Sequence, residues 1–176
     1  MFKNLRLSVK RKLHIDAPKK ALAGLVASPG GVATTMIMNH LSQFLPLNCP
    51  NDSDGLKHLV APPSWAENLP CLYIGGDEEA ILASLRRRGY MTIHAAKFGS
   101  ISGVLARGWS QEAILKALIK KQRTLWAELP NCLTISYDEI WDSKARIARH
   151  FCIDENLFVC NFPDRYERAS KIDGCQ

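Results

Sequence analysis

Apolar positions in the first third of the chain follow two different patterns. Residues 21–27 (ALAGLVA) form a short continuous apolar run, which is typical of a strand buried on both faces of a parallel sheet. Residues 34–45 (TTMIMNHLSQFL) place Ile37, Leu41 and other apolar side chains at helical spacing, and Pro46 ends the pattern. Small turn-forming residues separate the two. This stretch therefore predicts a strand, a glycine-rich turn and a helix.

The same alternation of strands and helices continues along the chain. The predicted strands are 21–27, 68–74 and 132–137. The predicted helices are 34–45, 77–88 with Gly89 beyond its end, 110–129 with Ser110 as its cap, and 143–151 with Asp142 or Ser143 as its cap. Residues 46–66 predict a long functional loop, residues 90–109 fit no single pattern, and residues 152–176 predict irregular structure.

Strands that alternate with helices favour an α/β fold of three layers, with a central parallel sheet and helices on both faces. Residues 21–176 are expected to form this single domain, and residues 1–20 an N-terminal extension. In such sheets ligands bind beyond the carboxyl ends of the strands. This rule predicts that segments 28–35, 75–84 and 137–142 lie at one edge.

Charge is distributed unevenly. Seven of the 23 Lys and Arg residues lie in residues 1–20 with one acid, whereas residues 21–176 hold 16 basic and 16 acidic residues. The net charge of +6 therefore belongs to the extension, and the neutral body predicts no nucleic-acid partner. The extension fits either an amphipathic helix on an anionic membrane or a disordered basic arm.

The six cysteines contain no CxxC pair, so neither a zinc motif nor a redox motif is present. No metal site is predicted. The basic N-terminus is followed by no clean apolar core with a cleavage site, so we expect no secretory signal. These observations together predict reduced thiols and a cytoplasmic protein, with membrane association through the extension as an alternative.

The turn after the first strand is the first candidate binding site. Its small residues allow backbone N–H groups to converge on an anion at the positive end of the following helix. The candidate residues are Gly30, Gly31, Val32, Ala33, Thr34 and Thr35. The motif GxxxxGK[ST] is absent, so this is no Walker A loop. A plain connection from strand to helix is the alternative.

Three segments together resemble the sulfotransferase family. Pro29 followed by Thr34 and Thr35 is similar to the family's loop for the 5′-phosphosulfate. Residues 74–84 (IGGDEEAILAS) resemble its strand, turn and helix bearing the serine that binds the 3′-phosphate, here Ser84. Residues 136–140 (SYDEI) look like its late strand end. The resemblance implies a P-loop-type, sulfotransferase-like fold and 3′-phosphoadenylyl sulfate (PAPS) as the donor, without a metal.

The sequence departs from that family at both of its usual cations. Gly30 stands where the loop normally has Lys or Arg, the loop is one residue longer, and Gly76 stands at the usual Arg. Arg88 shares a helix face with Ser84 and could hold a phosphate with it. Alternatively, 86–88 form a solvated helix end. A cation such as Arg168 or Lys171 could also fold over the site.

Lys57 and His58 are the candidates for catalysis, because they follow the first helix in the long loop. Sulfuryl transfer needs a base for the acceptor hydroxyl and positive charge near the leaving phosphate. A histidine exposed on the surface is the alternative for His58. His40 and His94 are weaker candidates, and Asp52 and Asp54 could simply be turn residues.

The resemblance implies an enzyme that transfers a sulfuryl group from PAPS, its nucleotide donor, to the hydroxyl of a carbohydrate or small metabolite. The alternative is a non-catalytic nucleotide- or glycan-binding relative that lost the catalytic cations. A P-loop phosphotransferase is disfavoured by the missing Walker A lysine. The acceptor would be selected by the loops 46–66 and 90–109, which carry no diagnostic pattern.

Overall fold

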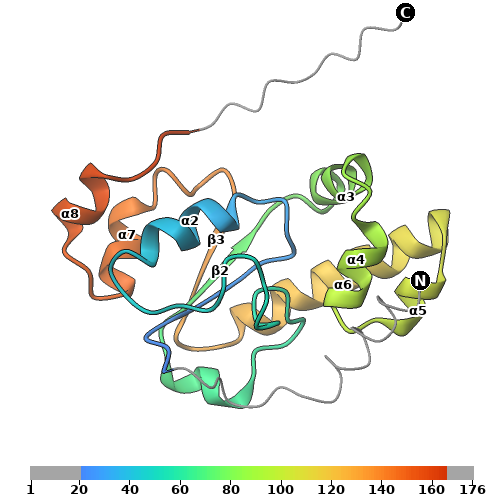
Figure 1. Cartoon of the computed structure of the whole chain (residues 1–176), viewed down its shortest axis with the longest axis horizontal. Helices are drawn as coiled ribbons and strands as arrows, with labels where there is room; N and C mark the ends of the chain where they lie inside the picture. Colours follow the sequence, from blue (N-terminus) through green and yellow to red (C-terminus); the bar gives the residue numbers. More distant parts are fainter. Residues whose placement is uncertain (1–20, 166–176) are drawn as a thin grey trace, which may run out of the picture.

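The structure, a computed structural model, describes residues 21–165 (Figure 1). The strands are β1 (Leu25–Ala27), β2 (Cys71–Gly75) and β3 (Cys132–Ser136). The helices are α2 (Thr34–Leu41), α3 (Glu78–Arg87), α4 (Met91–Lys97), α5 (Ile101–Leu105), α6 (Gly108–Ala127), α7 (Lys144–His150) and α8 (Glu155–Cys160), with a 3₁₀ helix, η1, at Ser64–Asn68.

The strands form one parallel sheet in the order β1-β2-β3. Leu25 pairs with Cys71, and Cys71 pairs with Cys132. The predicted α/β class and parallel sheet are therefore confirmed. β1 is shorter than the predicted strand, since only its last three residues join the ladder.

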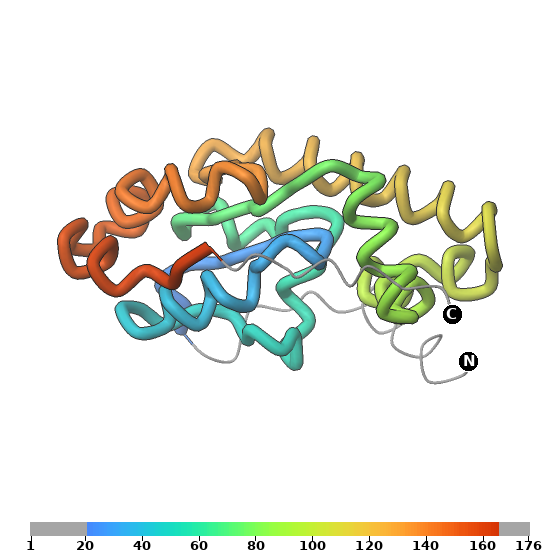
Figure 2. The backbone as a smooth tube through the Cα atoms, turned by 90° about the horizontal axis from the view of Figure 1, so that it is seen from above, coloured from blue at the N-terminus to red at the C-terminus, as the bar shows by residue number. Residues whose placement is uncertain are grey.

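Both faces of the sheet are buried by packed side chains. Val26, Leu72 and Ile135 point to one face, which α2, α3 and α7 cover. Leu25 and Tyr73 point to the other face, where Trp126 of α6 and the segment 56–66 pack. α2 and α6 lie on opposite sides of the strands (Figure 2). Strand residues alternate between these two sets because successive side chains of a strand point in opposite directions.

Helices also gather at the two ends of the sheet (Figure 1). α3, α4 and α5 pack against α6 at one end, whereas α7 and α8 pack against each other at the opposite end. The turn after β1 leads into α2 and contacts His94 of α4 at Gly30. This arrangement places the turn after β1 next to the group of helices formed by α3 and α4.

Several predicted boundaries are wrong. α2 ends at Leu41, because the chain then turns and the amide of Phe44 donates to the carbonyl of Leu41. α6 begins at Gly108, two residues before the predicted cap, and Ser110 instead donates its hydroxyl to the carbonyl of Arg107.

Two segments contain helices where none was predicted. Residues 90–109 contain the short helices α4 and α5, and the side chain of Ser100 caps α5. Residues 152–176 contain α8, where Asp154 accepts from the amide of Leu157. Short helices of this kind depend on caps and packing, so their apolar periodicity is too brief to detect in the sequence.

The N-terminal extension (1–20), Arg168 and Lys171 lie outside the described residues. Within 21–165, no helix has both the length and the apolar character needed to cross a bilayer.

The side chain of Asn48 pairs with the backbone of β1. Asn48 Nδ2 donates to the carbonyl of Val26 at 3.0 Å, and its Oδ1 accepts from the amide of the same residue at 2.9 Å. The Asn48 side chain is buried. A single amide side chain thus satisfies both backbone groups of a strand residue, as a neighbouring strand would.

Asn48→Asp should lower the free energy of unfolding by at least about 2 kcal/mol, because it replaces a buried donor with a carboxylate facing a carbonyl. Urea unfolding measures this. Asn51→Asp is the control, since Asn51 is exposed and its side-chain oxygen accepts from the amide of Ser53, which a carboxylate can also do. Equal stability of the two variants would show that the pairing at Asn48 contributes little.

Candidate anion-binding site

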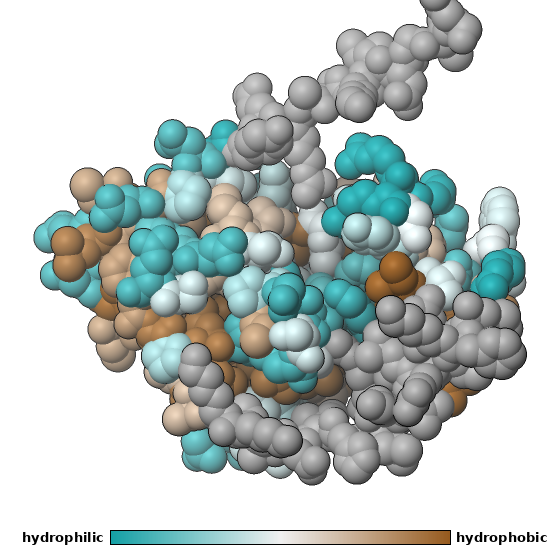
Figure 3. Space-filling model, viewed as in Figure 1, coloured by the Kyte–Doolittle hydropathy of each residue, from teal (hydrophilic) through white to brown (hydrophobic). Residues whose placement is uncertain are grey.

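A cleft of about 510 Å³ lies between the turn after β1, the loop 50–58 and helix α4. Its lining contains three cationic side chains and one carboxylate, which gives it a positive balance. The charged residues are Lys57, Arg88, Lys97 and Asp52. The surface around α3 is largely hydrophilic, with a small hydrophobic area over α4 (Figure 3). A cleft with this balance favours anionic ligands.

The turn between β1 and α2 forms one wall of the cleft. Gly30, Gly31 and Ala33 have φ angles of 95°, 77° and 55°, in the left-handed region that glycine tolerates best. Ser28 ties the turn together, because its Oγ accepts from the Gly30 amide at 3.3 Å and from the Thr34 hydroxyl at 2.7 Å. Ala33 at the N-cap makes no side-chain cap for α2. The wall therefore ends at a helix start whose dipole favours a negative charge.

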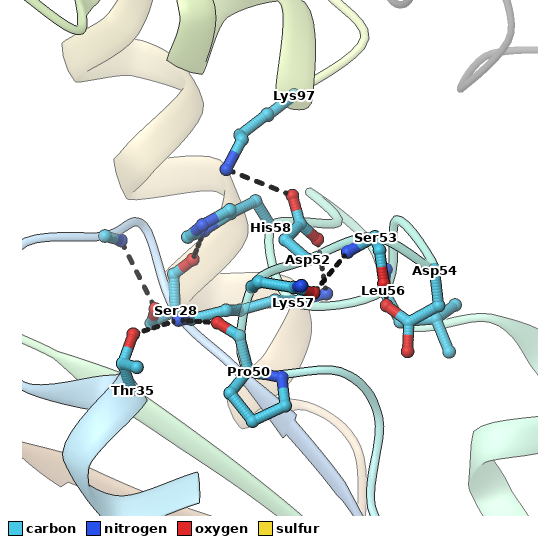
Figure 4. A network of polar contacts seen from close by, with 12 residues as sticks. Ser28, Thr35, Pro50, Asp52, Ser53, Asp54, Leu56, Lys57, His58 and Lys97 are labelled. Atoms are coloured by element: carbon cyan, nitrogen blue, oxygen red, sulfur yellow. Dashed lines mark hydrogen bonds and ion pairs between the residues drawn. The ribbon is translucent and has the colours of Figure 1, made fainter. Parts of the chain in front are cut away.

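Lys57 reaches this wall from the loop 50–58 (Figure 4). Its Nζ donates to the hydroxyl of Thr35 at 2.6 Å and to the carbonyl of Pro50 at 2.8 Å. Burial lowers the pKa of the Lys57 ammonium from 10.5 to about 8, Asp52 opposes this effect and Lys97 adds to it. The ammonium group thus lies at the start of α2, hydrogen-bonded to neutral oxygens.

His58 lies behind the same turn, and its Nδ1 is 2.7 Å from the carbonyl oxygen of Ser28. A carbonyl can only accept, so Nδ1 carries the hydrogen and donates it. In the neutral imidazole the lone pair is then on Nε2. This tautomer suits a proton acceptor, provided that a substrate hydroxyl can approach Nε2.

Asp52 joins the loop 50–58 to α4 across the cleft. Its Oδ1 accepts from the backbone amide of Lys57 at 3.1 Å, and its Oδ2 lies 3.3 Å from Nζ of Lys97 (Figure 4). The Asp52 side chain is buried, and its backbone has a φ of 62°. The first of these interactions is internal to the loop, and the ion pair with Lys97 links the loop to α4 across the cleft.

Ser84 and Arg88, which the sequence placed on one helix face, lie against the turn. A Cβ atom built on Gly31 would be 3.2 Å from Nη2 of Arg88 and 3.3 Å from Oγ of Ser84. Arg88 also donates from Nε to the carbonyl of Ser84 at 3.0 Å, and its guanidinium lies over the ring of Tyr90. A serine hydroxyl and a guanidinium therefore meet the turn at Gly31.

Helix α4 supplies site residues that sequence reasoning missed or ranked low. Tyr90, Ile93, His94 and Lys97 all line the cleft. Tyr90 and Ile93 are partly exposed there, whereas His94 is 5% exposed. The spacing of 90, 93 or 94, and 97 is that of one helix face, which is the only signal the sequence held for them.

Comparison with protein-family models, with curated proteins and with solved structures found no match for this chain. The architecture and the geometry of the cleft are therefore the basis for any functional conclusion.

The three segments expected at one edge line two different clefts. Residues of the turn 28–35 line the first cleft with Arg88, whereas Ser84 is buried against Gly31 and is not part of the lining. Gly76 and the start of 137–142 line a second cleft of about 400 Å³ beyond the ends of β2 and β3. A Cβ on Gly76 would be 3.1 Å from Cγ1 of Val32, so the turn itself occupies the space beside Gly76.

Other candidates serve the structure. His40 packs among phenylalanine rings, with Nε2 2.9 Å from the carbonyl of Phe158. Asp54 accepts from the amides of Cys49 and Leu56, as a turn residue does. Within residues 21–165 no group of three or more His, Cys, Asp or Glu side chains is arranged to hold a metal.

Gly30 is constrained twice, by its φ of 95° and by His94, whose Cε1 would lie 2.4 Å from a Cβ. Gly30→Ala should therefore destabilise the protein by at least about 1 kcal/mol more than Gly89→Ala. Gly89 has a φ of 67° but nothing within 4 Å of its Cβ, so it isolates the backbone strain. Thermal or urea unfolding compares the two. Equal losses would show that the His94 ring yields without cost.

The shifted pKa of Lys57 predicts a pH dependence of stability. Lys57 loses its proton near pH 8 when folded and near 10.5 when unfolded, so between these values the unfolded chain binds more protons. The free energy of unfolding should then rise with pH across this window, relative to Lys57→Met, which removes the group. Lys120→Met, at an exposed site on α6, is the control and should keep the rise. Parallel curves for wild type and Lys57→Met would contradict the burial of this ammonium.

Proposed function

We propose that the cleft binds PAPS and that the protein transfers its sulfuryl group to a hydroxyl of a carbohydrate or small metabolite. One observation carries the proposal: the single turn 30–35 is contacted by two separate polar groups. Lys57 bonds to its last residue, Thr35, while Ser84 and Arg88 lie against Gly31. Two clusters on one turn suit a ligand with two anionic groups.

The 5′-phosphosulfate would lie at the start of α2. Backbone amides of the turn and the threonine hydroxyls are donors there, and the helix dipole adds a partial positive charge. Lys57 supplies the cation that the turn itself lacks at Gly30. Lys57, which comes from the loop 50–58, would thus take the place of a cation within the turn.

The 3′-phosphate would lie between Ser84 and Arg88. A guanidinium with a neighbouring hydroxyl provides charge-assisted hydrogen bonds to phosphate oxygens. Arg88 would take the role of the arginine that Gly76 replaces, and the packing of Val32 on Gly76 explains why a larger side chain would be hard to fit there.

In the transfer step the acceptor oxygen forms a bond to sulfur as the bond between sulfur and the bridging phosphate oxygen breaks. His58, with its lone pair on Nε2, would take the acceptor proton. Lys57 would stabilise the negative charge that develops on the bridging oxygen. The products are a sulfate ester and adenosine 3′,5′-bisphosphate.

The test is affinity for adenosine 3′,5′-bisphosphate and for adenosine 5′-monophosphate, measured by calorimetry. The bisphosphate should bind at least about tenfold more tightly, a difference of about 1.4 kcal/mol. Arg88→Ala should remove the preference, whereas Arg87→Ala, the exposed neighbour on α3, should keep it. Equal affinity of the wild type for both nucleotides would refute the two-anion site.

Turnover with labelled PAPS and a panel of hydroxyl acceptors then separates an enzyme from the non-catalytic alternative. A loss of transfer in His58→Ala that far exceeds its loss of bisphosphate affinity supports the base role. Tight binding without transfer to any acceptor would instead favour a nucleotide- or glycan-binding module.

A further inference from the structure

His94 is a buried residue of the cleft lining, and one of its ring nitrogens lacks a hydrogen-bond partner among the described residues. The side chain is 5% exposed and belongs to the lining, and its Nδ1 is buried with no hydrogen-bond partner among the described residues. The ring packs edge-on against His58, with centroids 4.9 Å apart, and near-parallel to Tyr90. A buried polar atom without a partner is rare and costs stability, and a buried N–H donor without an acceptor costs more than a lone pair, so the enclosure of Nδ1 constrains the ring.

The enclosure of Nδ1 decides which ring nitrogen carries the hydrogen. A hydrogen on Nδ1 would bury an N–H group with no acceptor. A hydrogen on Nε2 leaves only a lone pair at the enclosed position and makes Nε2 a donor. His94 is thus assigned the tautomer opposite to that of His58, whose Nδ1 donates to the carbonyl of Ser28.

Burial, with the charges around His94 as a smaller cause, lowers the pKa of the ring and keeps it neutral. Burial, followed by the nearby His58, Lys97 and Arg88, lowers the pKa of His94 to about 2, and Asp52 opposes this only in part. The ring therefore cannot become a cation at ordinary pH. It is also a poor base, because its protonated form is disfavoured.

We propose that His94 is a neutral hydrogen-bond donor which recognises a ligand oxygen through Nε2–H. Of the two histidines, His58 is then the one whose Nε2 carries a lone pair. The proposal rests on the proposed function, and it assigns a specificity role within that site. The ligand class is an oxyanion, a phosphate or sulfonate group held at the turn. An uncharged donor adds a hydrogen bond to a ligand oxygen. It adds no further positive charge to a cleft that is already lined by three cationic side chains.

Gly30 explains why this donor is held in place. The Cε1 atom, between the two ring nitrogens, is the atom nearest to a Cβ built on Gly30, at 2.4 Å. The ring therefore fits under the turn only because residue 30 has no side chain. The same contact brings the imidazole to the segment that would hold the anion.

The tautomer can be observed directly. In ¹⁵N-labelled protein, long-range ¹H–¹⁵N NMR should show His94 as the neutral Nε2–H form from mildly acidic to neutral pH, with His94→Phe used to assign the signals. On addition of adenosine 3′,5′-bisphosphate, or of inorganic sulfate as a small probe, the Nε2–H proton should move downfield. A hydrogen on Nδ1, or an unchanged Nε2–H signal at saturation, would overturn the proposal.

Two variants test the donor by binding. His94→Gln retains an N–H donor and should keep the affinity for the bisphosphate within about threefold, while His94→Phe keeps an aromatic ring without a donor and should lose about tenfold. Both should be compared at matched folded fractions, established by urea unfolding. Wild-type affinity in His94→Phe would overturn the proposal.

The outcomes for the two proposals differ. If sulfate binds and the bisphosphate does not, the nucleotide function fails, and the role of His94 stands only if His94→Phe weakens sulfate binding. If the bisphosphate binds equally to wild type and His94→Phe, the nucleotide function stands and the role of His94 fails. If neither probe binds, both fail.

Discussion

Four segments meet at Ser28, and the site depends on their hydrogen bonds. The Ser28 amide donates to the carbonyl of Lys57 at 2.9 Å, which fixes the loop 50–58 against the end of β1. Its carbonyl accepts from His58, and Gln122 of α6 contacts the same oxygen at 3.4 Å. Its hydroxyl accepts from the turn and from Thr34 of α2. Buried backbone groups must find partners, and here those partners are the segments that carry the cleft.

This constraint explains why a long loop with little regular structure can hold Lys57 and His58 in defined positions. Gln122 is fully buried and donates to the carbonyl of Leu59 at 2.8 Å, and Trp126 donates to that same carbonyl at 3.0 Å. Hydrogen bonds thus fix this segment to α6 through the carbonyl of Leu59 and to the end of β1 through the carbonyl of Lys57. Asp52 adds the third attachment, to α4. These three attachments hold the segment that carries Lys57 and His58 against β1, α6 and α4.

The sequence was most informative where a pattern was long or chemically distinctive. The apolar runs ending near Ala27, Ile74 and Ser136 identified three strands, and the small residues before Thr34 located the turn. Residue type and a place in the loop after the first helix make Lys57 and His58 candidates, and the structure places both in the lining of the first cleft, while their catalytic roles stay a prediction. The sequence does not predict α4, because its seven residues are too few for a clear apolar period. Tyr90 and Lys97 are therefore not among the predicted site residues. Tertiary contacts across the cleft, such as that of Asp52 with Lys97, leave no local signal in a sequence.

The two clefts at the carboxyl end of the sheet differ in how their charges are used. In the second cleft Asp77 caps α3, Glu139 accepts from the amide of Ser136, and Glu78 pairs with Arg123 at 3.0 Å. These three carboxylates of the second cleft therefore have structural partners, and their negative charge disfavours anions there. In the first cleft the hydrogen bonds of Lys57 go to neutral oxygens, so its charge is not cancelled by a bonded carboxylate. The distribution of charged side chains on the two sides of β2 thus favours an anion on the β1 side, where the turn, Ser84 and Arg88 converge.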